Sequence, residues 1–172
     1  MDPGTEAILA DYNRARRELA TWLAAASAQD LRRRSNGTRW TNGQLLFHMV
    51  FGYMVVRALL PLVRIVSRLP RPLGTAFAAL LNAGTRPFDV VNYWGSCAAA
   101  TVYNRNRMAR KLDRTIESLA RQLERETPES LALTMAFPDR WDPFFSPTMT
   151  LNEVYAYPTL HFDFHAQQLS LH

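Results

Sequence analysis

Three histidines of this 172-residue chain have a spacing that suits a metal site. His161 and His165 stand four residues apart in the segment LHFDFHAQQL, and His48 lies far earlier, in TNGQLLFHMV. Residues four apart on an α-helix lie on one face, so two imidazoles can reach the same ion. A third imidazole from a facing helix would complete a set of three nitrogen ligands.

Three protein ligands and an open position are typical of a catalytic metal site, whereas a structural zinc site is usually closed by four. Imidazole binds zinc, nickel, copper or iron, so the ligand set does not name the metal. We expect Gln168 and Asp163 to provide hydrogen bonds that fix the ring tautomers. The alternative is that His161 and His165 are surface or capping residues and His48 a core residue. The spacing favours the metal site slightly.

A helix that begins at Thr41 is expected to carry His48. The Thr41 hydroxyl can cap the helix while Gln44, three residues on, reaches back to the N–H group of the cap. The apolar residues that follow extend this helix to Pro61, where the missing N–H group should kink or end it.

The last helix, which carries the other two histidines, begins at a second capping box, formed by Thr150 and Glu153. Pro158 lies inside this helix, three residues before His161, and should break one backbone hydrogen bond there. We expect the proline either to kink the helix and aim the histidines or to mark its effective start.

Apolar stripes at helical spacing indicate two further long helices, one near the N-terminus and one around residues 108–123. Prolines and glycines interrupt residues 58–100, which we interpret as short helices and loops over one end of a bundle. The aromatic residues between 128 and 147 indicate an ordered loop, and no alternating run predicts a sheet. The sequence thus predicts an all-α four-helix bundle with extra short helices between helices 2 and 3, in a single domain over residues 1–172.

The net charge of +5 gives little support for a nucleic-acid partner. Lys111 is the only lysine among twenty basic residues, and this arginine bias is typical of a GC-rich genome. The one dense basic run, residues 32–34, has no recognised nucleic-acid-binding motif beside it, so we interpret it as a solvated face.

Cellular location is constrained by the same composition. A single cysteine, Cys97, excludes an internal disulfide and is typical of a reducing compartment. The first residues contain no basic segment followed by an apolar one, so we expect a cytoplasmic protein without a signal peptide. Residues 58–81 are unusually apolar, which favours extra core or a dimer face over a lipophilic pocket or a membrane-facing lid. We expect the arginines of this stretch to be solvated, although they could bind anionic lipid: Arg57, Arg64, Arg68 and Arg71.

Two segments resemble the motifs of the DinB-like superfamily. RWTNGQLLFHM is similar to its second-helix motif, in which a tryptophan and a capping threonine precede a histidine. TLNEVYAYPTLHFDFHAQQL is similar to its last motif, a capped helix with H-x-x-x-H-x-x-Q-L. The resemblance covers nearly the whole chain and implies a four-helix bundle. It also implies one divalent metal held by His48, His161 and His165, and frequent dimerisation.

The resemblance further implies a choice of chemistries. Members include S-transferases that use thiols such as bacillithiol or mycothiol, mycothiol-dependent isomerases and hydrolase-like resistance proteins. We therefore expect a thiol transferase, with zinc or nickel, that acts on a small electrophile. A thiol at the open position would lose its proton and attack, whereas water there would lead to hydrolysis. A metal-dependent hydrolase and a non-enzymatic metal-binding or apolar-ligand-binding bundle remain the alternatives.

Other reactive residues give weaker signals. A lone cysteine such as Cys97 is usually a small buried hydrophobe rather than a nucleophile. The capping position of Glu153 already explains that residue, which leaves a role as general base as the weaker alternative. Four polar residues before the third long helix could line a pocket: Asn92, Tyr93, Tyr103 and Asn104.

Overall fold

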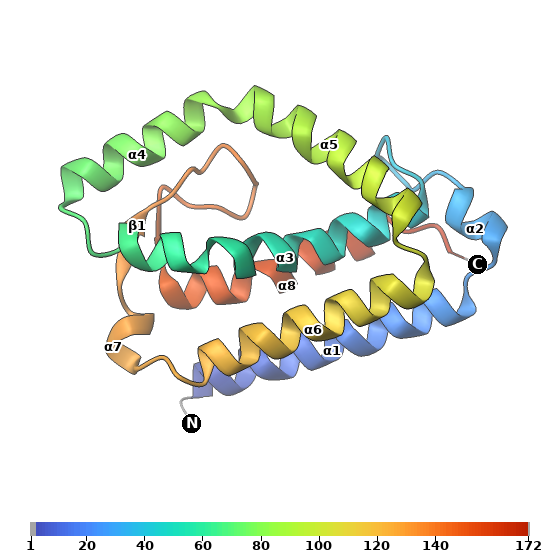
Figure 1. Ribbon diagram of the computed structural model, residues 1–172, viewed down its shortest axis with the longest axis horizontal. Coiled ribbons are helices and arrows are strands. Elements are labelled where there is room, and N and C mark those ends of the chain that lie inside the picture. Colours follow the sequence, from blue (N-terminus) through green and yellow to red (C-terminus); the bar gives the residue numbers. More distant parts are fainter. Residues whose placement is uncertain (1–2, 172) are drawn as a thin grey trace.

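The computed structural model describes residues 3–171, and within this range most residues belong to eight helices. Figure 1 shows two layers of long helices, with α3 and α8 side by side in one layer and α1 and α6 in the other. The predicted all-α four-helix bundle is confirmed. Its four helices are α1 (Pro3–Ala25), α3 (Asn42–Val66), α6 (Arg105–Leu123) and α8 (Leu151–Ala166).

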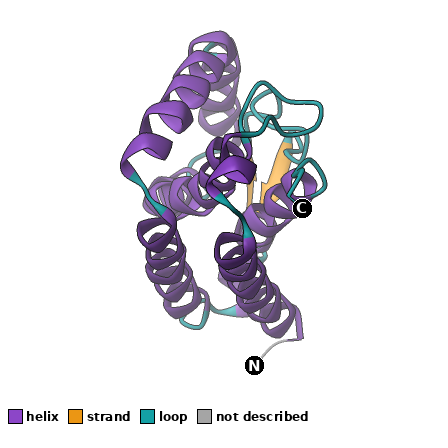
Figure 2. Cartoon of the chain, turned by 90° about the vertical axis from the view of Figure 1, so that its right-hand side faces the viewer, coloured by secondary structure: helices purple, strands orange, loops and turns teal. Residues whose placement is uncertain are grey.

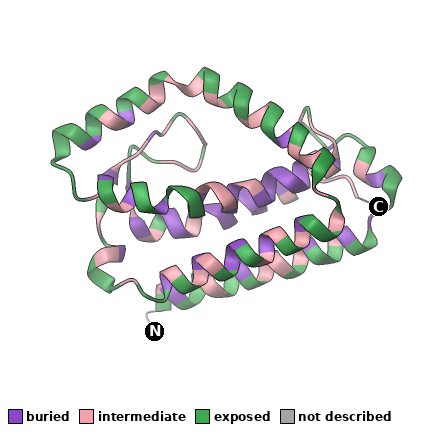
Figure 3. Cartoon of the chain, viewed as in Figure 1, coloured by how far each residue is buried: buried purple, intermediate pink, exposed green. Residues whose placement is uncertain are grey.

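Apolar stripes hold the two layers together. In α6 the residues at spacings of three and four are buried, while arginines and acids occupy its other faces. Helix α3 packs against α5, α6 and α8 and is buried around most of its first half (Figure 3). Within residues 3–171 it is the one helix long and apolar enough to span a membrane, yet nearly half of its most apolar stretch lies inside the bundle.

Two helices form an arch over α3, where the sequence predicted shorter helices and loops (Figure 1). They are α4 (Arg71–Ala83) and α5 (Thr85–Val102). Their prolines, Pro72 and Pro87, lie in the first helical turns, where backbone N–H groups have no partner within the helix. Gly84 separates the two helices. Prolines in these positions do not interrupt a helix. The two helices are therefore longer than the many prolines of this region led us to expect.

Helix α3 does not end at Pro61, as the sequence allowed, but continues to Val66. Pro61 removes the hydrogen bond to the carbonyl group of Arg57, and both residues are exposed, so water can replace that bond. Helix α8 likewise begins at Leu151 and continues through Pro158. In the turn before this proline, the hydroxyl group of Tyr12 donates a hydrogen bond of 2.6 Å to the carbonyl oxygen of Tyr155.

The remaining elements are short: α2 (Ala28–Arg32), α7 (Pro128–Leu131), β1 (Thr134–Ala136) and β2 (Thr148–Thr150). The two antiparallel strands have three residues each, too few to give a visible alternation in the sequence, and they lie beside the bundle (Figure 2). The loop between them is ordered. In that loop Trp141 stacks on Phe88 of α5, with 4.1 Å between ring centroids, and its indole N–H group donates to the Leu81 carbonyl oxygen.

The outer surface of the arch and the end of α3 is largely exposed (Figure 3), and many of its exposed residues are apolar. This surface includes part of residues 58–81, which we interpreted from the sequence as extra core or a dimer face, and continues beyond them to Val102. A dimer face or a membrane contact there remains a prediction. Its large exposed residues are Ile65, Leu69, Leu73, Leu80, Val90, Val91, Trp94 and Val102.

A partly buried ion pair joins α3 to the chain that follows α6. Arg64, which we expected to be solvated, pairs with Glu126, and the Tyr155 and Ser130 hydroxyl groups also donate to this carboxylate. Burial alone would raise the pKa of Glu126, but these hydrogen bonds and the arginine charge lower it below its ordinary value of about 4.5. Because the pKa is lower in the folded state, the ionised carboxylate stabilises the fold above about pH 4.5. That contribution is lost as the pH falls through the folded pKa.

Replacing Glu126 by glutamine should lower the free energy of unfolding at pH 7 by about 1–3 kcal/mol, because charged hydrogen bonds are lost. Urea unfolding at pH 7 and at about pH 3 measures this. The difference between the two proteins should shrink as the pH is lowered, because protonation of the wild-type carboxylate removes its contribution. An equal difference at both values would contradict the account.

Candidate metal centre

The three histidines of the sequence pattern meet between α3 and α8. Their ring centroids are 4.9 Å apart for His48 and His161, 4.8 Å for His48 and His165, and 4.6 Å for His161 and His165. One ring nitrogen of each lies within 4.8 Å of the others, and all three side chains are buried. The structure therefore forms a cluster of three imidazoles that could hold one metal ion.

Local sequence explains this convergence. The capping boxes at Thr41 and Thr150 are both formed, so they begin the two helices at the expected residues. One turn after His48, Gly52 leaves room for the ring of His161 from the facing helix. A Cβ atom on Gly52 would lie 2.9 Å from Cδ2 of His161, closer than side chains tolerate. Glycine at this position therefore lets the two helices place their histidines together.

Each imidazole uses its Nδ1 atom for a hydrogen bond. The pairs are His48 with Ser96 Oγ (3.2 Å), His161 with Asp142 Oδ2 (3.0 Å) and His165 with Gln168 Oε1 (2.7 Å). The carboxylate and amide oxygens only accept, so Nδ1 carries the proton in the latter two rings. The hydroxyl group of Ser96 can accept in the same way. Nε2 is then the unprotonated nitrogen of each ring.

The Nε2 atoms fit a cation. Nε2 of His161 is fully buried and has no hydrogen-bond partner, which is costly for a polar atom. A lone pair on a buried, unpartnered nitrogen is the donor that a metal ion would satisfy. Nδ1 atoms bound to oxygen acceptors are also typical of metal-binding histidines. On these observations the residues present fit a divalent cation held by three imidazole nitrogens.

Burial favours the neutral form of two of the imidazoles, His48 and His165. Burial, and then the proximity of the other histidines, lowers the pKa of His48, and the same causes lower that of His165 to about 4. Burial alone would raise the pKa of Asp142, but the hydrogen bond and charge of His161 lower it. Asp142 is therefore ionised and accepts a further hydrogen bond of 2.8 Å from Tyr157. This anion, together with the buried ring nitrogens, favours a bound cation.

Of the two expected partners of the rings, the structure places one beside them. Gln168 bonds to His165. Asp163 instead accepts two hydrogen bonds of 2.8 Å from Arg14 of α1. Because Asp163 follows His161 by two residues, it lies on a different face of α8. The spacing of two residues in the sequence is enough to predict that these two side chains do not share a face of the helix.

Asp142, Ser96 and Gly52 are site residues that sequence reasoning missed. Asp142 comes from the loop before β2, and Ser96 comes from α5 beside Cys97, which is itself only partly buried. Neither has a spacing that relates it to the histidines. A signal did exist for Gly52, since a glycine four residues after His48 lies on the same helical face.

The other candidate residues from the sequence analysis either have structural roles or line a cavity. Glu153 completes the cap of α8, and Asn104 caps α6, so both have structural roles. Tyr103 packs on Phe47, away from the histidines. Asn92 and Tyr93 line a cavity beside His165.

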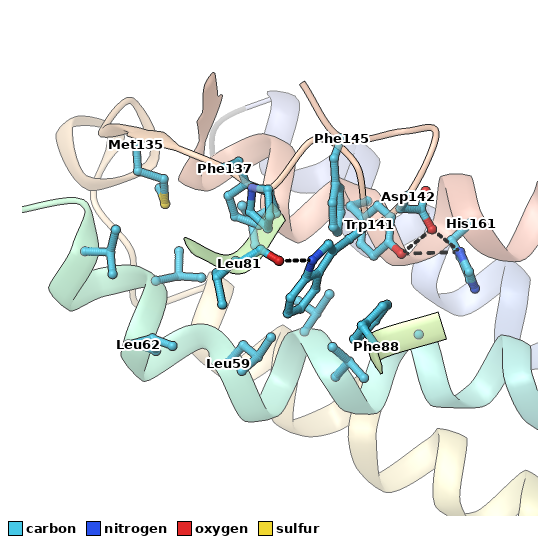
Figure 4. Close-up of a pocket in the computed structure, with 18 of the residues that line it drawn as sticks. Leu59, Leu62, Leu81, Phe88, Met135, Phe137, Trp141, Asp142, Phe145 and His161 are labelled. Atoms are coloured by element: carbon cyan, nitrogen blue, oxygen red, sulfur yellow. Dashed lines mark hydrogen bonds and ion pairs between the residues drawn. The ribbon is translucent and has the colours of Figure 1, made fainter. Parts of the chain in front are cut away.

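Two cavities meet at the three histidines. The first has an empty volume of about 980 Å³, part of it open to solvent, and has His48 and His161 in its wall. Apart from a few groups near these histidines its walls are apolar (Figure 4). The second has an empty volume of about 800 Å³, part of it open to solvent, borders His165 and is lined mostly by polar residues. These polar walls include Thr38, Arg39, Asp89, Asn92, Tyr93 and Gln168.

Fold and site together define a helical bundle with a candidate three-histidine metal centre. A family model described as the DinB superfamily matches residues 11–169, so this chain belongs to the DinB superfamily. The resemblance seen in the two sequence motifs is thereby confirmed. No curated protein and no solved structure matches the chain.

Replacing Asp142 by asparagine should weaken metal binding by about 10–100-fold, because removing an outer hydrogen-bond partner or its charge has this effect at other sites. Isothermal titration with zinc measures the affinity. Asp163→Asn is the matched control, because its partner is Arg14 and its affinity for zinc should be unchanged. Equal effects of the two substitutions would contradict the role of Asp142.

Replacing Gly52 by alanine should weaken zinc binding by about tenfold or more, since the new methyl group displaces the ring of His161. Gly95→Ala in α5 is the control, because a Cβ atom there meets nothing within 4 Å. That control should keep the affinity and gain up to about 1 kcal/mol in stability from helix propensity. Retained affinity in the Gly52 variant would refute the steric account.

Proposed function

We propose that this protein is a divalent-metal-dependent transferase that activates a low-molecular-weight thiol for attack on an apolar electrophilic small molecule. The observation that carries the proposal is the meeting of two cavities of different polarity at three histidines. A transferase needs room for two substrates beside one reactive centre. Hydrolysis needs only one such cavity, because water is the second reactant.

The protein groups have distinct tasks in this proposal. The three Nε2 atoms would hold the cation, while Ser96, Asp142 and Gln168 keep each ring in one tautomer and orientation. A divalent cation bound there would lower the pKa of a thiol at its open position, so that the thiolate is present at neutral pH. Trp40 stacks on His48, with 4.3 Å between ring centroids, and limits access of water to that ring.

The second cavity suits the thiol. Arg39 lies over the ring of Tyr93, 4.5 Å from its centroid, and has no acidic partner among the ion pairs of residues 3–171. Its guanidinium group is therefore free to bind a carboxylate. A polar thiol that carries a carboxylate matches this wall. Zinc and nickel suit the ligand set, and mycothiol-like thiols follow from the resemblance to the family.

Thiol consumption tests the proposal. Protein purified without a histidine tag and loaded with zinc or nickel should couple a low-molecular-weight thiol to monobromobimane or an epoxide. The rate should fall at least a hundredfold in His161→Ala. A screen of several thiols without activity, in protein that holds stoichiometric metal, would contradict the proposal. Consumption of the electrophile at the same rate without thiol would instead identify a hydrolase.

A further inference from the structure

The lining of the apolar cavity extends along much of α3. Its floor is one stripe of α3 that runs from His48 to Val66. At 1.5 Å per residue this stripe is about 27 Å long. From Val55 to Val66 every residue of the stripe that lines the cavity is apolar. The cavity therefore offers an elongated apolar wall that matches an extended hydrocarbon chain.

Polar groups occupy one end of this cavity. Figure 4 shows Asp142 and His161 at the opposite end from Leu62 and Met135. Asn92 of α5 belongs to the polar end, because Ser96, one turn further on, bonds to His48. Its Oδ1 atom is buried and has no hydrogen-bond partner. An N–H or O–H group of a ligand would satisfy it.

Contacts between the loop and the arch hold the walls of the cavity together. Trp141 stacks on Phe88 and donates a 2.7 Å hydrogen bond to the Leu81 carbonyl oxygen, which joins the loop to the arch. Asn82 of α4 donates to Asp139 at 2.8 Å and reinforces the same contact. A preformed apolar cavity binds without the cost of ordering its walls.

We infer that this cavity binds an elongated amphiphile, with its hydrocarbon chain along α3 and one head group beside the histidines. The head group carries a hydrogen-bond donor that reaches Oδ1 of Asn92. The chain lies over the apolar stripe between Val55 and Val66. The reaction at the head rests on the proposed function, whereas binding of the chain does not.

Chain length supplies the direct test. Isothermal titration of metal-free protein with 1-alkanols from butanol to decanol should show an affinity gain of about fourfold per methylene, from about 0.8 kcal/mol for each buried CH₂ group. The gain should persist to the longest chain, because the added methylene groups lie along α3, away from the head group. An affinity that is independent of length, or that stops rising after the shortest chains, would overturn the inference.

A matched pair of variants tests the position of the chain. Leu62 lines the cavity and is 41% exposed, so Leu62→Glu should fold and should weaken decanol binding at least tenfold. Ile65 lies on the same helix, is 60% exposed and does not line the cavity, so Ile65→Glu should bind as the wild type does. Circular dichroism checks folding, and Leu59→Glu repeats the test at a second lining residue. Equal loss in the Leu62 and Ile65 variants would refute binding in the cavity.

Different experimental results would refute the proposed function and this inference. Length-dependent alkanol binding without thiol activity would leave the cavity assignment intact and refute the transferase. If both hold, kcat/KM for zinc-loaded protein with 2,3-epoxy-1-alkanols, whose hydroxyl group supplies the donor, should rise with chain length by a similar factor per methylene. Thiol activity with no dependence on chain length would support the transferase and contradict the amphiphile.

Discussion

The close approach of α3 and α8 is the constraint on which the site depends. Two imidazoles on one helix and one on the other converge only if the helices keep their register and spacing. Gly52 permits the spacing, because a larger residue would strike the ring of His161. The register is held by buried hydroxyl groups: Tyr53 of α3 bonds to Thr159 of α8 at 2.9 Å, and Tyr12 of α1 donates to the carbonyl oxygen of Tyr155.

Segments outside the four-helix bundle supply hydrogen-bond partners for two of the histidines. The arch contributes Ser96 to His48, and the loop before β2 contributes Asp142 to His161. The same two segments roof the apolar cavity and are fixed to each other through Trp141. Orientation of the histidines and formation of the cavity are therefore coupled. A substitution that displaces the arch should therefore change both the tautomers of the histidine rings and the shape of the cavity.

Periodic and local features made much of this structure predictable. Apolar stripes identified the four bundle helices, and capping boxes placed the starts of α3 and α8 within a residue. The pair His161 and His165 with His48 follows from helical spacing and from the motif resemblance. The lengths of α4 and α5 were underestimated, because a proline in a first turn looks the same in sequence as a proline that breaks a helix.

Partners brought together by tertiary packing were not predictable in this way. Asp142 lies in a loop whose path depends on aromatic contacts, and no spacing connects it to His161. The choice of Asp163 rested on proximity in sequence, although a separation of two residues turns a side chain to another face of the helix. The cavity could not be predicted from the sequence either, because the residues that line it come from four separate segments.

X-ray absorption spectroscopy on metal-loaded protein purified without a histidine tag tests the central claim most directly. The account predicts one divalent ion per chain with three imidazole nitrogens at about 2.0–2.1 Å and a fourth, non-protein ligand. The imidazole signal should disappear together with the metal when His48 is replaced by alanine. A first shell with fewer than three imidazoles, or with sulfur from Cys97, would contradict a three-histidine centre with an open position.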